Sequence, residues 1–306
     1  MFRFTAEQKT FNIAGVKVGG QPGQVPTVMI GTIFYHGDKL VVDEREGVFN
    51  RSAAEEVLRK EEEISLRTGN PRIVDVCASH PQAFEKFIDF VADVVEGPFC
   101  IDGTTADVRI AGARYVMEVG LSNRVIYNSI SPDVKDAELQ AIKDAGIKSA
   151  VLLLLNVRNP LISGKFEVID ELLRKASTAG VENVLIDTAT IDILDPGPVS
   201  KAIYLVKERY GYPAGCGAHN AIDIWRKRTK LSPGVKFSGT ILANVLPVVM
   251  GADFLLYGPI ENAAKIYPPV ALANAYAAYT LWQEYGVKPP AGNHPFYNLS
   301  KIAAIE

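Results

Sequence analysis

The stretch AVLLLLNVRNPLISGKFEVIDELLRKASTAGVENVLID (residues 150–187) decides the fold class of this chain. It begins and ends with apolar runs, at residues 150–156 and 184–187, in which successive positions are apolar, as in strands buried on both faces. The longer segment between them is amphipathic and ends at Gly180, a residue that often terminates helices. The pattern predicts a strand, a crossover helix and a second, parallel strand.

The same alternation extends from about Val28 to about Tyr285. The runs predicted to be strands are residues 28–35, 73–77, 99–102, 125–129, 150–156, 184–187, 213–218 and 253–257. Eight parallel strands with helices between them favour a (β/α)8 TIM barrel over a doubly wound open sheet, which is the alternative. We expect one α/β domain over residues 1–306, with an N-terminal hairpin at about residues 1–25 on the barrel floor.

Composition excludes several classes of protein. The net charge is −3, from 32 Lys and Arg against 35 Asp and Glu, so there is no broad positive field for nucleic acid or an anionic membrane. No apolar run is long enough for a membrane span, so we expect no membrane insertion. The cysteines Cys77, Cys100 and Cys216 are far apart and odd in number, which argues against a disulfide scaffold and favours a cytoplasmic location.

Polar residues recur where the predicted strands end. Asp102 ends the third strand, Asn128 lies in the fourth, Asp187 ends the sixth and Asn220 follows the seventh. The carboxyl ends of barrel strands form the mouth where active sites lie. Each residue alone is equally a turn or capping residue, but together they offer acceptors and donors to an aminopyrimidinone ring.

Two further residues are weaker candidates for the site. Asp75 falls in the middle of the second predicted strand, which favours a structural role inside the barrel. His219 stands beside Asn220, where a histidine is an acid or base, or a hydrogen-bonded structural residue.

A zinc site with thiolate and imidazole ligands is a rival interpretation of the cysteines and histidines. Cys77, Cys100 and Cys216 all fall in predicted strands, and His80 and His219 follow two of these strands. The spacing lacks a close Cys-x-x-Cys or His-x-Cys pair, and cysteines in apolar strands are usually core residues. We therefore expect no metal.

Several long strings resemble a known family. GGQPGQ (19–24), GTIFYHGDKLVVDEREGVF (31–49), YNSIS (127–131), GCGAHNA (215–221) and LYGPIENA (256–263) resemble the H subunit of tetrahydromethanopterin S-methyltransferase and its bacterial relatives. Among those relatives the chain looks closest to the corrinoid protein:tetrahydrofolate methyltransferases of glycine betaine metabolism. At greater distance it is similar to the methyltetrahydrofolate:corrinoid methyltransferases of acetogens.

The resemblance implies a function and roles for the candidate residues. It implies transfer of a methyl group from a methylated corrinoid to N5 of tetrahydrofolate, with the cobalamin carried by a partner protein, since the chain lacks an Asp-x-His-x-x-Gly corrinoid motif. Asp102, Asn128 and Asp187 would then hold the pterin, and Asn220 would lie beside N5 as the catalytic residue. The segments after Asp102 and Asp187 and before Asn220 depart from the acetogen pattern, so the residues around N5 differ from those of the acetogen enzymes.

Other interpretations stay open at this point. One is methyl transfer involving tetrahydromethanopterin as a subunit of a larger complex, another is a non-catalytic pterin-binding subunit, and a third is dihydropteroate synthase, whose phosphate-binding signature is not seen. A homodimer is also expected, by resemblance and because the segment after Pro259 is rich in small residues. These residues, which equally suit packing on the barrel, are Ala263, Ala264, Ala271, Ala273, Ala275, Ala277 and Ala278.

Overall fold

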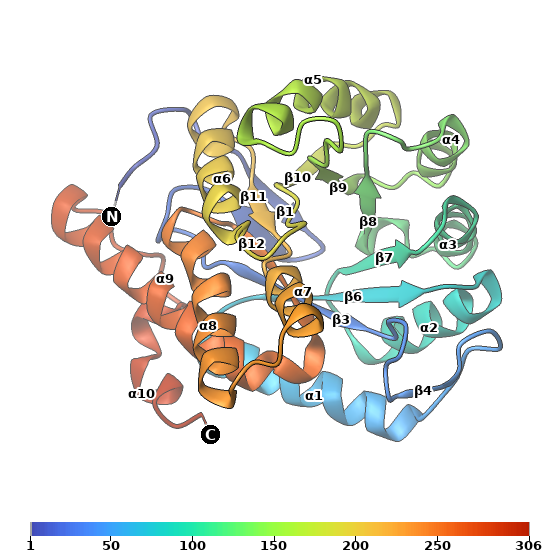
Figure 1. Ribbon diagram of the computed structural model, residues 1–306, viewed down its shortest axis with the longest axis horizontal. Helices are drawn as coiled ribbons and strands as arrows, with labels where there is room; N and C mark the ends of the chain where they lie inside the picture. Colours follow the sequence, from blue (N-terminus) through green and yellow to red (C-terminus); the bar gives the residue numbers. More distant parts are fainter. Residues whose placement is uncertain (1, 306) are drawn as a thin grey trace.

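The computed structural model describes residues 2–305 and contains a closed barrel of eight parallel strands. Around the barrel the order is β10–β11–β12–β3–β6–β7–β8–β9, so consecutive strands are neighbours and the last pairs with the first (Figure 1). The predicted TIM barrel is confirmed. The strands are β3 (Val28–Ile33), β6 (Arg72–Ala78), β7 (Phe99–Gly103), β8 (Val125–Ile130), β9 (Ser149–Leu153), β10 (Asn183–Asp187), β11 (Ala214–Cys216) and β12 (Phe254–Pro259).

Helices follow the barrel strands and cover the outside of the barrel (Figure 1). They are α1 (Arg51–Thr68), α2 (Pro81–Val94), α3 (Ala106–Glu118), α4 (Asp136–Asp144), α5 (Ile162–Thr178), α6 (Pro196–Tyr210), α7 (His219–Arg228), α8 (Pro233–Val249), α9 (Ala263–Tyr285) and α10 (Leu299–Ile302). Single 3-10 turns occur at Ser122–Arg124, Ile260–Asn262 and Pro295–Tyr297, and the loop after β3 carries the short pair β4 (Val41–Asp43) and β5 (Val48–Phe49). No helix within residues 2–305 combines the length and apolar content that crossing a membrane requires.

Glycine ends three of these helices, α1, α6 and α9, by a specific backbone geometry. α1 ends at Gly69, whose φ of 84° lies in the left-handed region, and the Gly69 N–H donates to the Ser65 carbonyl. The same geometry ends α6 at Gly211, with φ of 65°. Residues with a Cβ rarely adopt this conformation, which is why glycine marks these helix ends in the sequence.

An antiparallel hairpin, β1 (Thr10–Ile13) and β2 (Val16–Gly19), closes the floor of the barrel. Ile13 and Val18 of the hairpin are buried in one cluster with apolar side chains of the barrel interior, including Val28, Ile73 and Phe254. The hairpin therefore excludes water from the end of the barrel opposite the carboxyl ends of the strands. That the whole chain forms one domain stays a prediction.

The alanines of α9 do not form an exposed dimer face. Six of the seven alanines named above are buried within the chain, and Ala264 alone is exposed. A Cβ on Gly23 would lie 2.6 Å from the Ala278 backbone nitrogen, so the N-terminal segment passes directly over this part of the helix. The small residues therefore serve intramolecular packing, and the small-residue argument for a homodimer is wrong. The homodimer itself stays a prediction.

Candidate functional site

A layer of polar side chains lies at the carboxyl ends of the strands. Residues two apart on a strand point to the same side. Ile30, Ile73, Cys100, Ile126 and Leu185 form part of the apolar cluster inside the barrel. The residues two positions further along the same strands form what we call the polar layer: Thr32, Asp75, Asp102, Asn128 and Asp187. Strand register keeps neighbours level, since Thr32 is paired with Asp75 and Asp102 with Asn128.

Asp75 is the centre of the hydrogen bonds in this layer. One of its carboxyl oxygens accepts from the Thr32 hydroxyl at 3.0 Å, and the other accepts from the Asn128 amide nitrogen at 3.1 Å. Burial and the neighbouring Asp102 carboxylate raise the pKa of Asp75 to about 7. Because both oxygens already accept hydrogen bonds, Asp75 orients Thr32 and Asn128 and is less available to a ligand.

Asp102 keeps one carboxyl oxygen without a hydrogen-bond partner among residues 2–305. Its Oδ2 accepts from the Cys77 thiol at 3.4 Å, and the side chain is only partly buried. Burial raises the pKa of Asp102, while the Cys77 contact and the charge of Arg109 act in the opposite direction. Arg109 is held nearby by a 2.8 Å hydrogen bond to the Gly103 carbonyl and by an ion pair with Glu138. Asp102 can therefore accept a hydrogen bond from a ligand at the mouth.

Asp75, Cys77 and Asp102 also form the one group within residues 2–305 with three ligand atoms close enough for a metal ion, all within 4.8 Å of one another. Burial and the two carboxyl groups raise the pKa of the Cys77 thiol well above its usual range, so it acts here as a hydrogen-bond donor. The cysteines weighed for zinc are not gathered into a site. Cys100 lies in the apolar layer below, and Cys216 lies on β11 near Asp187. The expected absence of a metal stays a prediction.

Asp187 ends β10 on another part of the mouth. Its Oδ1 accepts from the Ala189 backbone N–H at 2.7 Å, and burial raises its pKa to about 6. Lys165 of α5, which is buried, donates to the Ala189 carbonyl at 3.0 Å, and its charge acts to lower the pKa of Asp187. The second carboxyl oxygen of Asp187 has no hydrogen-bond partner within the described residues and can accept from a ligand.

His219 is held in one tautomer at the start of α7. Its Nδ1 lies 2.9 Å from the Leu256 carbonyl oxygen, which can only accept, so Nδ1 carries the proton. Burial lowers the pKa of His219, which favours the neutral ring with a free lone pair on Nε2. His219 therefore presents an acceptor at the mouth.

Asn220 is the second residue of α7, and its side chain is exposed. The residue that caps this helix is Ala218, and no side chain makes a capping hydrogen bond there. The alternative role considered for Asn220, a helix cap, is therefore wrong. Its side-chain amide lies over Gly217. A Cβ added to Gly217 would lie 3.2 Å from the side-chain amide nitrogen of Asn220.

The structure brings Asp75, Asp102 and Asn128 into one cluster on adjacent strands. Asp187 and Asn220 lie further around the same mouth, at the ends of β10 and β11. Sequence reasoning missed Thr32 and Lys165. Thr32 lies two residues after Ile30 in a predicted strand, so its inward direction was available from the alternation. Lys165 belongs to a helix, and its approach to Asp187 depends on tertiary packing.

The arrangement suits a flat heterocycle with several N–H donors. Free acceptors come from one oxygen each of Asp102 and Asp187, and the Asn128 amide oxygen has no partner within the described residues. Acceptors of this kind, fixed at the mouth of a barrel above an apolar interior, match the N–H pattern of an aminopyrimidinone ring.

Comparisons with known proteins agree with this fold. Over residues 6–289 the chain matches the family described as the tetrahydromethanopterin S-methyltransferase MtrH subunit. It is 38% identical to the H subunit of tetrahydromethanopterin S-methyltransferase from Methanothermobacter thermautotrophicus, covering 98% of this chain and 100% of the relative. It is 36% identical to the protein of the same name from Methanocaldococcus jannaschii, again covering 98% and 100%.

Solved structures with a similar fold include dihydropteroate synthases. The enzyme of Xanthomonas albilineans matches with a TM-score of 0.59 at 16% identity, covering 92% of this chain and 99% of that one. The enzyme of Yersinia pestis matches with a TM-score of 0.62 at 11% identity, covering 88% and 98%. At such low identity these matches show a shared barrel fold and nothing about activity.

Proposed function

The chain belongs to the MtrH family of tetrahydromethanopterin S-methyltransferase subunits, and on this premise we propose that it transfers a methyl group at N5 of a tetrahydromethanopterin-type pterin. The observation that carries the proposal is the polar layer, which offers buried carboxyl and amide acceptors at the mouth of a barrel. Alignment of the reactants and control of charge on the pterin are the main tasks in such a displacement. No covalent protein nucleophile is needed.

The assignment to tetrahydrofolate is corrected. The predicted reaction had tetrahydrofolate as the methyl acceptor and cofactor, in glycine betaine metabolism. The relatives that match nearly the whole chain carry the name of tetrahydromethanopterin methyltransferase, which was the alternative interpretation. The resemblance to tetrahydrofolate enzymes rested on sequence strings that are shared across the family. Strings of this kind are expected to bind the ring that the two pterins have in common, so they do not distinguish the two pterins.

In the proposed complex the ring lies against the polar layer. Asp102, Asn128 and Asp187 accept hydrogen bonds from its N–H groups, Asp75 holds Asn128 in place, and the Asn220 amide lies beside N5. An amide can donate to a bare nitrogen or accept from a protonated one, which suits an atom whose protonation changes during the reaction. His219, neutral and with Nδ1 engaged, adds a further acceptor.

We further propose that the chain works as part of a larger enzyme, with a separate corrinoid protein docked over the mouth as the methyl carrier. The names of the relatives describe one subunit among others. The chain itself contains no Asp-x-His-x-x-Gly motif with which to hold a corrinoid. A bound corrinoid supplies a cobalt centre that carries the methyl group, and this chain supplies the pterin site.

The decisive test is methyl transfer by the purified chain. It is mixed anaerobically with tetrahydromethanopterin and free methylcobalamin, which stands in for the corrinoid protein, and 5-methyltetrahydromethanopterin is quantified by mass spectrometry. We expect product formation that depends on the chain. If calorimetry shows that the chain binds the pterin but no product forms, even after the corrinoid partner is added, the chain is a non-catalytic pterin-binding subunit. Absence of pterin binding would overturn the proposal.

Removal of a ring-binding carboxylate gives a first prediction. Asp102→Ala and Asp187→Ala should each weaken binding of tetrahydromethanopterin by about 1.5–3 kcal/mol, the range for hydrogen bonds to charged groups. Titration calorimetry measures the effect, and Asp43→Ala, at an exposed position in the loop after β3, serves as the matched control. Unchanged affinity in both site variants would remove these residues from the site.

A further inference from the structure

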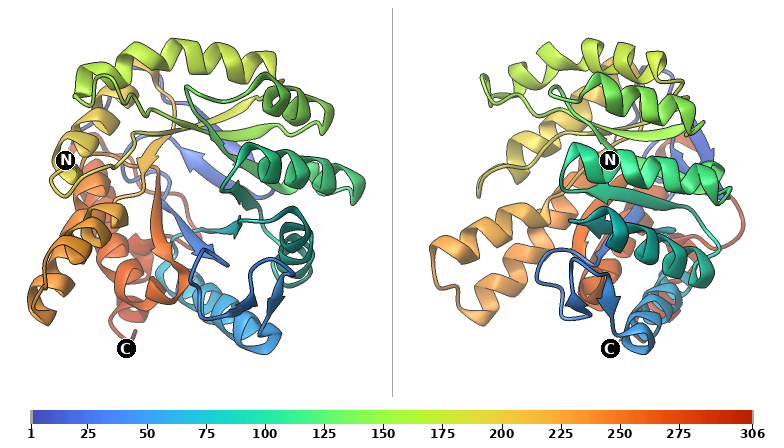
Figure 2. Two further views of the ribbon diagram at one scale, coloured as in Figure 1. Left: turned by 45° about the vertical axis from the view of Figure 1, so that its right-hand side comes forward. Right: turned by 90° about the vertical axis from the view of Figure 1, so that its right-hand side faces the viewer.

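A cavity of about 540 Å³ lies beside the barrel mouth, between the ends of β3 and β12 and the helices α7 and α8. Figure 2 shows α7 and α8 as a pair of helices that project from the body of the barrel (orange). Apart from His219 and Asn220 at the start of α7 and Thr32 of the polar layer, neither this helical pair nor the cavity lining has a role in the ring site described above. The cavity is large enough for a substantial part of a small molecule.

The cavity adjoins the polar layer directly. Thr32 lines the cavity and also donates the 3.0 Å hydrogen bond to Asp75. His219, at the start of α7, lines it as well. A molecule bound at the polar layer that continues outward past Thr32 and His219 therefore enters this cavity.

The charge in the cavity is predominantly positive. Three cations line it, Arg226 of α7, Lys236 of α8 and Lys265 of α9, against the single carboxylate of Asp223. Asp223 is engaged by Arg226 at 3.2 Å. Within residues 2–305, neither Lys236 nor Lys265 forms an ion pair with a carboxylate. Two ammonium groups without an ion-pair partner among the described residues favour an anionic ligand group at this cavity.

Part of the remaining cavity wall is apolar. Ile222, Phe237 and Ile241 line it, and Phe237 is 57% exposed, so its ring is available to a ligand. Exposed aromatic side chains at a cavity bind the apolar and aromatic parts of ligands. The lining thus combines a surface for an aryl group with cations for an anion.

We propose that this cavity binds the tail of the substrate pterin, with its aryl segment on Phe237 and Ile241 and its phosphate or carboxylate groups between Lys236 and Lys265. The inference rests on the proposed function, and it assigns a binding site to the part of the substrate that does not contact the ring site. Tetrahydromethanopterin has such a tail, with an aryl ring followed by anionic groups. The polar layer selects the pterin ring, and the cavity selects for the tail.

The test compares a pterin with a tail and one without. Calorimetry is performed with tetrahydromethanopterin and with 6-methyltetrahydropterin, on the unmodified chain and on Lys236→Ala, Lys265→Ala and the double variant. We expect each single variant to weaken binding of tetrahydromethanopterin about 10-fold, near the strength of one charge-assisted contact. Binding of 6-methyltetrahydropterin should not change. Added salt should weaken binding of the tailed ligand selectively.

Two controls separate the tail site from the ring site. Lys227→Ala removes an exposed cation of α7 that does not line the cavity, and it should leave both affinities unchanged. Asp102→Ala should weaken both ligands equally. Binding of tetrahydromethanopterin that is insensitive to both lysines, or an equal loss for the two ligands in the lysine variants, would overturn the tail site while the proposed function stands. Failure of the unmodified chain to bind either pterin would overturn both.

Discussion

Asp75 and Asp102 place two carboxyl groups in one small buried volume, where both cannot ionise at low cost. Each negative charge raises the free energy of forming the other, and burial adds to the effect. Below about pH 7 the pair therefore holds one proton. A carboxylate accepts hydrogen bonds from the N–H groups of a pterin ring more strongly than a protonated carboxyl group does, so ligand binding and loss of this proton are linked.

The linkage predicts a pH dependence of pterin affinity. The pKa of Asp75 lies at about 7 in the free chain, so below this pH the pair binds a proton that the ligand must displace. The dissociation constant for tetrahydromethanopterin should rise by up to about tenfold per unit as the pH falls from 7 to 5.5, the limit for one linked proton. Calorimetry in two buffers of different ionisation enthalpy measures the released proton. Asp75→Asn should move this dependence to lower pH, and a constant affinity from pH 5.5 to 8 would contradict the linkage.

Asn220 carries the chemical step in the proposed mechanism. Its amide is exposed at the second position of α7 and makes no capping hydrogen bond, so the side chain contributes little to folding. Asn220→Ala should slow methyl transfer about 10²-fold or more, within the range for loss of one transition-state hydrogen bond, and weaken pterin binding less. Single-turnover rates with tetrahydromethanopterin, on protein of verified folded fraction, measure the effect. A normal rate per folded molecule would exclude the catalytic role, and Asn220→Gln tests whether placement of the amide matters.

At the scale of elements, the strands explain which residues could be predicted. Asp102 and Asp187 end apolar runs in the sequence, and the closed parallel barrel brings all such ends to one mouth. Asp75 was interpreted as structural because it lies in mid-strand, yet strand register sets it level with Thr32 and next to Asn128 in space. Local patterns reveal the direction of a side chain and do not reveal how far each strand is shifted along its neighbour.

Residues contributed by helices escaped prediction for a different reason. Lys165 and Lys236 lie on helices, where charged side chains usually face water and carry no local signal. Their place at the mouth depends on how α5 and α8 pack after the chain has turned back on itself. The choice of pterin escaped prediction for the same reason, since the cavity that we assign to the tail is built mainly from α7 and α8.

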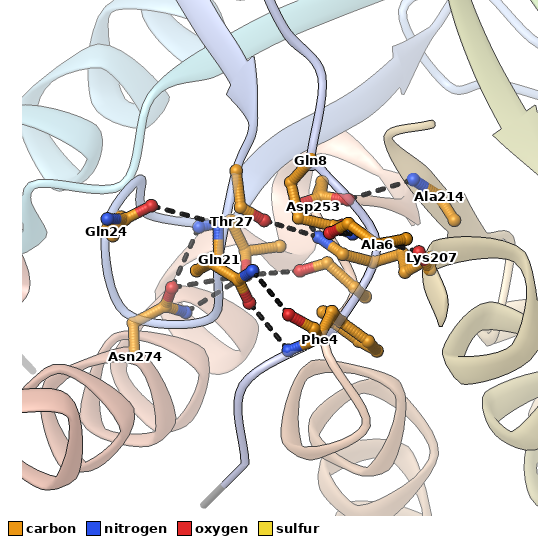
Figure 3. Close-up of polar contacts among 12 residues, drawn as sticks. Phe4, Ala6, Gln8, Gln21, Gln24, Thr27, Lys207, Ala214, Asp253 and Asn274 are labelled. Atoms are coloured by element: carbon orange, nitrogen blue, oxygen red, sulfur yellow. Dashed lines mark hydrogen bonds and ion pairs between the residues drawn. The ribbon is translucent and has the colours of Figure 1, made fainter. Parts of the chain in front are cut away.

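For the whole molecule, the floor of the barrel has its own polar network, far from the mouth. Figure 3 shows Lys207 of α6 beside Asp253, which precedes β12, with Asp253 reaching the backbone of Ala214 on β11. The Lys207 ammonium also donates to the Gly20 carbonyl at 2.8 Å, just after the hairpin. The Gln8 amide donates to the Lys207 carbonyl at 2.9 Å. One buried ion pair thus joins the N-terminal segment, an outer helix and the two strands β11 and β12.

This network predicts a loss of stability that is separable from function. Lys207→Met leaves Asp253 buried without its cation, and removal of one partner of a buried pair costs about 3–5 kcal/mol. In the double variant Lys207→Met/Asp253→Asn, the new amide oxygen can still accept from Ala214 and no unpaired charge remains, so most of the loss should be recovered. Urea unfolding at pH 7 measures both values, and a single-variant loss under about 1 kcal/mol would show that the pair is not coupled to folding.

Because the network lies at the end of the barrel opposite the polar layer, methyl transfer per folded molecule should be unchanged in both variants. A rate that fell together with stability would instead mean that the floor sets the geometry of the mouth through the strands that span the barrel.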